Sequence, residues 1–82
     1  MNQERRKAIG RIIEALERIE HGIDGVCYEE QEYFDNMPDT VQDKEANAVQ
    51  KSINDLGWAR EAVSEALGYL ASIEVNNQGA KL

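Results

Sequence analysis

Apolar residues in the first half of the chain recur at helical spacing from Ile9 onward. Two rows follow a seven-residue repeat: Ile9, Leu16, Ile23 and Met37 form one, and Ile12, Ile19, Val26 and Tyr33 form the other. Ile13, Cys27 and Phe34 lie one place beyond the second row and widen the stripe, which Glu20 interrupts. The repeat is typical of an amphipathic helix and not of a strand. A stripe of this width needs more than one neighbouring helix to cover it.

The second half of the chain repeats the pattern with smaller side chains. Its rows are Val49, Leu56, Val63 and Leu70, and Ser52, Ala59, Ala66 and Ile73, with Ile53 and Leu67 beside them. Small side chains let two helix axes approach closely. Gly57 and Gly68 each cost about 1 kcal/mol in a helix interior relative to alanine, so they suit close backbone contact or are tolerated surface positions.

A segment that disfavours helix separates the two periodic halves. Pro38 restrains Met37 away from helical geometry and lacks a backbone donor. We therefore predict a helix over about residues 3–34, a tip at 35–42 and a second helix over about 43–74. Residues 1–75 then form a single domain. Residues 76–82 carry Asn, Gln and Gly without periodicity, and we expect a flexible tail there.

The predicted fold class is all-α: a long antiparallel two-helix hairpin that dimerises into a four-helix bundle. A chain of 82 residues buries only about 60–65% of the surface that it exposes when unfolded. The single cysteine, Cys27, rules out an internal disulfide framework and suits a reducing compartment. Self-association, most simply as a homodimer, is the remaining source of stability.

Two glycines lie in the middle of the first predicted helix. Gly22 and Gly25 together weaken the helix by roughly 2 kcal/mol. Either the helix bends there, or a partner backbone or a ligand approaches closely. The sequence leaves open whether the glycines mark a kink or a contact site.

The charge pattern points to protein partners. The net charge of −7 disfavours direct binding of nucleic acid or anionic membrane. No apolar run approaches the ~20 residues of a membrane span, and the first residues lack a signal-peptide core. We therefore expect a soluble protein of the cytoplasm. Acidic residues are concentrated between Glu29 and Glu45, where they are solvated surface or, in an alternative interpretation, an acidic mimic of nucleic acid.

The chain contains no recognisable catalytic or metal-binding motif. Glu17 and His21 are four residues apart, whereas the di-iron bundle signature needs Glu-x-x-His on two helices. A nucleophile motif, a phosphate loop and a second histidine are also missing from the sequence. We therefore expect a protein that is not an enzyme, without a metal or other cofactor.

Basic residues crowd the start of the chain. Arg5, Arg6 and Arg11 lie at a predicted helix N-terminus, where they oppose the helix dipole but would also lie beside the C-terminus of the second helix, which favours cations. An alternative function follows from the same residues. With exposed helix N–H groups they could bind phosphate, so that an oligomer would act as a sponge for a nucleotide signal.

Aromatic residues concentrate at the predicted tip. Aromatic and methionine side chains are enriched in interface cores. We predict a partner-binding site with four central contacts, Tyr33, Phe34, Asn36 and Met37. Its acidic rim is Glu29, Glu32 and Asp35. Alternatively, Tyr33 and Phe34 only plug the end of the bundle.

The tip sequence, Glu29-Glu30-Gln31-Glu32-Tyr33-Phe34-Asp35-Asn36-Met37-Pro38-Asp39-Thr40-Val41-Gln42, resembles that of short helical proteins of tailed bacteriophages and prophages. Those proteins share an acidic helix end, a Tyr-Phe/Asp-Asn-Met/Leu-Pro-Glu-Ser-Leu-Gln segment and a second amphipathic helix. Asp39, Thr40 and Val41 replace Glu, Ser and Leu here. The resemblance implies a phage accessory protein that binds a host or defence protein and inhibits or redirects it. Gly22, Gly25 and Trp58 are not part of the pattern.

Overall fold

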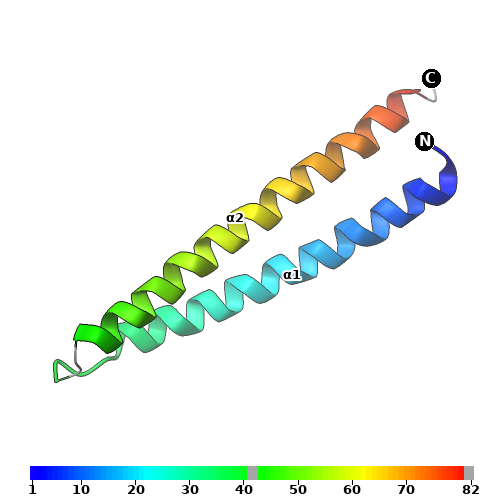
Figure 1. The fold of residues 1–82 in the computed structure, drawn as a ribbon. Helices are drawn as coiled ribbons and strands as arrows, with labels where there is room; N and C mark the ends of the chain where they lie inside the picture. The colour runs from blue at the N-terminus through cyan, green and yellow to red at the C-terminus, as the bar shows by residue number, and fades with distance from the viewer. Residues whose placement is uncertain (41–42, 81–82) are drawn as a thin grey trace.

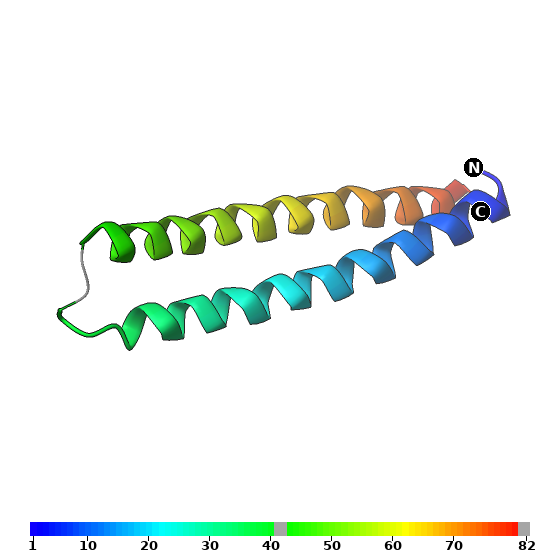
Figure 2. The same cartoon turned by 60° about the horizontal axis from the view of Figure 1, so that its bottom comes forward.

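Two long helices make up the computed structural model, α1 over Gln3–Asp35 and α2 over Asp43–Ala80. The structure describes residues 1–40 and 43–80, and only the backbone of 77–80. The helices lie side by side and antiparallel, so the start of α1 and the last turns of α2 share one end (Figure 1). The opposite end is the tip, and a view turned by 60° shows the same arrangement (Figure 2). The predicted all-α antiparallel hairpin is confirmed.

Asn residues cap both ends of α1. The Asn2 side chain accepts a hydrogen bond from the backbone N–H of Arg5 at 2.8 Å, which satisfies one donor of the first turn. At the other end, the backbone N–H of Asn36 donates to the carbonyl of Glu32 at 3.0 Å. Pro38 follows directly after Met37. α1 therefore ends at Asp35, next to the predicted end at residue 34.

α2 is longer than the sequence pattern predicted. It continues past Glu74, the predicted end of the helix, to Ala80, so the first residues of the predicted flexible tail are helical. Asn and Gly are weak helix formers but do not break a helix, Gln and Ala are good helix formers, and extending an existing helix costs much less than starting one. Val41 and Gln42 of the predicted tip, and residues 81 and 82 of the predicted tail, lie outside the described residues.

The two helices meet along one narrow seam. Half-buried apolar side chains spaced three and four residues apart form it: Ile9, Ile13, Leu16, Ile23, Cys27 and Phe34 from α1, with Val49, Ile53, Leu56, Val63, Leu67 and Leu70 from α2. Glu20, Glu30 and Glu74 are half-buried at the same spacing. Within the described residues, no side chain is fully buried. The hairpin has a seam but no enclosed core.

Four glycines of the helices make no close contact within the hairpin. α1 runs without interruption through Gly22 and Gly25, and a Cβ added at either would meet no atom within 4 Å. The same holds at Gly57 and Gly68. The close backbone contact expected at Gly57 and Gly68 is therefore absent between α1 and α2, and both are surface positions.

Neither described helix combines the length and the apolar character that a membrane crossing requires.

Candidate interaction surfaces

One face of the hairpin exposes a row of large apolar side chains on α1. Ile12, Ile19 and Val26 are 49%, 50% and 49% exposed, and Tyr33 is 56% exposed. They are spaced seven residues apart and therefore lie along one side of α1, next to the seam. This is the second row of the sequence pattern. The antiparallel partner helix leaves it uncovered.

The matching side of α2 carries the row of small residues. Val26 and Ser52 line the same shallow groove, together with Leu56 of the seam, so both rows lie on the same side of the hairpin. We call this side the apolar face. It consists of Ile12, Ile19, Val26 and Tyr33 of α1 and Ser52, Ala59, Ala66 and Ile73 of α2. Ala8, Ala15 and Gly22 extend it on α1 with small side chains.

The other side of the seam, which we call the polar face, carries charged residues. Its residues on α1 include Glu14, Glu17, His21, Asp24, Tyr28 and Gln31. Arg60 of α2 donates a hydrogen bond to Asp24 and forms an ion pair with it across the helices. This hydrogen bond and the charge of Asp24 raise the pKa of Arg60 above its usual value, with a smaller contribution from Glu20. The pair links the middle of α1 to the middle of α2.

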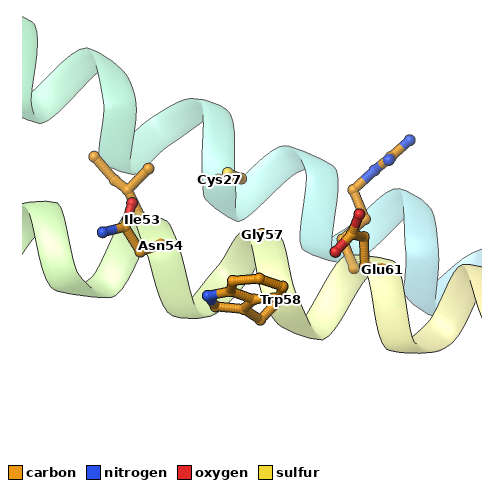
Figure 3. Close-up of a pocket in the computed structure, with 7 residues that line it drawn as sticks. Cys27, Ile53, Asn54, Gly57, Trp58 and Glu61 are labelled. Atoms are coloured by element: carbon orange, nitrogen blue, oxygen red, sulfur yellow. The ribbon is translucent and has the colours of Figure 1, made fainter.

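A second shallow groove lies beside this ion pair (Figure 3). Cys27, Ile53 and Arg60 line its floor near the seam, and Gly57, Trp58 and Glu61 line its α2 side. Figure 3 shows the Trp58 ring on the side of α2 that points away from α1. The ring is thus an exposed wall of the groove and not part of the seam.

The outer surface of α2 carries two exposed aromatic residues that the sequence patterns missed. Trp58 is 70% exposed and Tyr69 is 75% exposed. They are eleven residues apart, which is close to three helical turns, so they lie on the same side of α2. Both fall outside the seven-residue rows, and their own spacing is the signal that would have grouped them. We call this pair the aromatic stripe.

The residues predicted to bind a partner at the tip lie on different sides of the hairpin. Tyr33 is on the apolar face, whereas Phe34 and Met37 are half-buried, Phe34 in the seam. Asn36 is the exposed C-cap of α1. The rim residues Glu29, Glu32 and Asp35 are exposed, and their three-residue spacing places each acid about 60° from the next, in a strip that winds around α1.

Two of these rim carboxylates have local partners. Tyr28 donates from its hydroxyl to Glu32 at 3.4 Å, and Gln31 donates from its amide to Asp35 at 3.0 Å.

The basic end does not form a single anion site. Arg5, Arg6 and Arg11 point in three directions around α1, as their positions in a helix require. None of the three forms an ion pair with another residue in the described ranges, 1–40 and 43–80. The backbone N–H of Arg5, which a phosphate would otherwise use, is bonded to Asn2. A nucleotide site at this end would need residues from more than one copy.

Glu17 and His21 lie exposed on the polar face. Over the described part of the chain, no group of three His, Cys, Asp or Glu side chains is placed to hold a metal ion.

No family model, curated protein or solved structure matches the chain. The surfaces described above are therefore the basis for a functional proposal.

Proposed function

We propose that the protein is a non-enzymatic binding protein whose working form is a homodimer, with two hairpins packed as a four-helix bundle. The observation that carries the proposal is the apolar face. Four large side chains in a row are about half exposed, on a hairpin in which no described residue is fully buried. Monomeric soluble proteins rarely leave such a continuous apolar row in water.

The shape of the hairpin supports the same proposal. Its radius of gyration is 18.6 Å, whereas a compact domain of this length has about 12 Å. Its accessible surface is 6431 Å², whereas a compact monomer of this mass exposes about 5,000 Å². A second hairpin on the apolar face would bury part of this excess and supply the core that one copy lacks.

The proposed partner of the dimer is a host or defence protein in the cytoplasm of the host cell, which the dimer inhibits or redirects. The tip sequence supports this part of the proposal, because it resembles that of phage accessory proteins. Asn36 is exposed there, whereas Tyr33 belongs to the apolar face that the second copy would cover. The aromatic stripe offers a second contact surface, because tryptophan and tyrosine are the residue types most enriched at binding hot spots.

Self-association is tested by light scattering at ~100 μM, together with circular dichroism. The proposal expects a dimer mass with full helicity. A monomer mass with full helicity would contradict it.

Partner binding is tested by affinity capture from host lysate, with mass spectrometry of the proteins and metabolites retained. Trp58→Ala and Tyr69→Ala remove exposed side chains of the aromatic stripe, and each should weaken capture of a specific protein by ~30-fold if it is a hot spot. Glu32→Gln serves as a matched control on the exposed rim and should change capture only a few-fold. Phe34→Ala separates binding from stability, because a half-buried Phe34 should lower the melting temperature instead.

The same experiment decides between the functional classes. A protein captured by the wild type and lost with Trp58→Ala or Tyr69→Ala supports the proposal. A nucleotide retained without any specific protein, and lost when Arg5, Arg6 and Arg11 are replaced, would favour the sponge instead.

A further inference from the structure

We propose that the second copy covers the apolar face in the opposite direction, so that the tip of each hairpin lies at the basic end of the other. This inference rests on the proposed self-association and specifies its face and direction. In this arrangement α1 packs on α1 of the second copy, and α2 packs on α2. A two-fold axis perpendicular to the long axis of the hairpin relates the two copies.

The apolar face has the symmetry that this axis requires. Asp24 pairs with Arg60, and Gly10 lies opposite Glu74, so residues at the same level have numbers that add to about 84. The row on α1 is centred between Ile19 and Val26, and the row on α2 between Ala59 and Ala66. These two centres lie at the same level by that rule. One axis therefore matches both rows with their copies.

The size of the face fits a stable pair. The hairpin is 64 Å long and 14 Å wide, so one face has a projected area of about 900 Å², against about 800 Å² contributed by each partner in a standard interface. Charged side chains are few on it. Half-buried Glu30 and exposed Asp55 line the groove beside Val26, and Glu29 lies at the edge of the face, whereas the polar face carries the Asp24–Arg60 ion pair in its middle.

Charge selects the direction of the second copy. The tip carries Glu29, Glu32, Asp35 and Asp39, and the other end of α1 carries Arg5, Arg6, Lys7 and Arg11; all are exposed except Arg6, which is half-buried. If both hairpins pointed the same way, the two acidic tips would lie together and repel each other. In the opposite direction, each acidic tip lies beside a basic end, and like charges are separated by most of the hairpin length.

This arrangement also distinguishes the two glycines of α1. Gly22 lies at the level of the axis, on the side of α1 that meets α1 of the second copy. Gly25 lies three residues on and points to the outside. A Cβ at Gly22 has open space within one hairpin, and the second copy would occupy that space.

Cysteine cross-linking tests the direction of the second copy, and the cysteines are placed outside the apolar face. Lys7→Cys and Asp39→Cys are made separately in a Cys27→Ala background, and both positions are exposed. Mixing the two variants with a flexible bifunctional thiol reagent should join Lys7→Cys of one copy to Asp39→Cys of the other, and Asp39→Cys alone should give no joined pair. Each variant keeps the helical spectrum of the parent as a control for folding.

Sedimentation tests the face. Ile19→Asp places a carboxylate in the interface and should weaken self-association at least about 100-fold, because the buried charge would have no partner. Tyr28→Asp is the matched control, a similar change at an exposed residue of the polar face, and should leave association within a few-fold. If Ile19→Asp does not fold, the cross-links still decide the direction.

The outcomes of the two experiments test the direction, the face and the dimer itself separately. Rapid cross-linking of Asp39→Cys with itself, in a protein that still dimerises, would overturn the direction but leave the proposed self-association standing. Loss of association with Tyr28→Asp but not with Ile19→Asp would overturn the face. A monomer without cross-links at either position would refute the inference and the proposed dimer together.

Discussion

The apolar and polar faces of the hairpin are built from the same two helices, yet their chemistry differs. On the apolar face, large side chains of α1 stand beside small side chains of α2, and few charges interrupt them. On the polar face, an interhelical ion pair between Asp24 and Arg60 spans the helices and carboxylates surround it. The polar face is stable in a single hairpin, because water solvates its charged side chains. The apolar face is satisfied only when another surface excludes water from it.

The largest expected effect is on stability, and it should depend on where a truncated side chain lies rather than on how large it is. Ile19→Ala should lower the free energy of unfolding by about 2–4 kcal/mol, because Ile19 becomes buried in the dimer. Trp58→Ala removes a larger side chain but should cost less than about 0.5 kcal/mol, because a residue that is 70% exposed remains so. Urea denaturation at one protein concentration measures both. If truncating Trp58 costs more than truncating Ile19, the apolar face is not the buried one.

Replacement by alanine should change the free energy of unfolding differently at the two glycines of α1. Gly25→Ala should stabilise the protein by about 1 kcal/mol, because alanine is the better helix former and nothing contacts the site. Gly22→Ala should give no gain or a loss, because the methyl group would meet the second copy. Thermal melts of both variants at the same concentration provide the measurement. Equal stabilisation by the two substitutions would remove Gly22 from any interface.

The smallest expected effect concerns charge at the tip. Asp35→Lys with Asp39→Lys changes the net charge from −7 to −3, because each substitution adds two charges. Lower net charge should favour association in general. In opposite-direction pairing, the double variant should instead weaken it by up to about fivefold, because each tip then repels a basic end.

A matched control isolates the position of the charge. Glu61→Lys with Glu65→Lys makes the same change in net charge at mid-hairpin, on exposed residues, and should not weaken the dimer. Sedimentation at moderate salt compares the two double variants, because added salt screens these surface charges. Tighter association of the tip variant than of the wild type would indicate that the tips lie together.

The sequence predicted the hairpin because its periodicity is strong and Pro38 separates the two halves. The sequence also indicated a stripe too wide for one neighbour. It could not say which row would remain uncovered, since that depends on how α1 and α2 rotate about their axes. The structure places Ile13 and Cys27 in the seam and leaves Ile19 and Val26 at its edge.

The interaction sites were harder to predict. Tyr33 and Phe34 are neighbours in sequence, but the ~100° turn per residue places one on the apolar face and the other in the seam. Trp58 and Tyr69 escaped notice because neither belongs to a seven-residue row. The end of α2 was misplaced because Asn76, Asn77 and Gly79 have weak helix propensity, while the preceding turns already provide a template for continued helix.

The proposed dimer is tested most directly by the stability of the wild-type chain as a function of its own concentration. If two hairpins share a core, raising the concentration 100-fold, from ~1 to ~100 μM, should raise the melting temperature by about 5–10 °C, because mass action favours the dimer by about 2.7 kcal/mol. Circular dichroism at 222 nm is the readout. A melting temperature independent of concentration, with full helicity at the lowest value, would show that one hairpin is stable alone and would contradict the central claim.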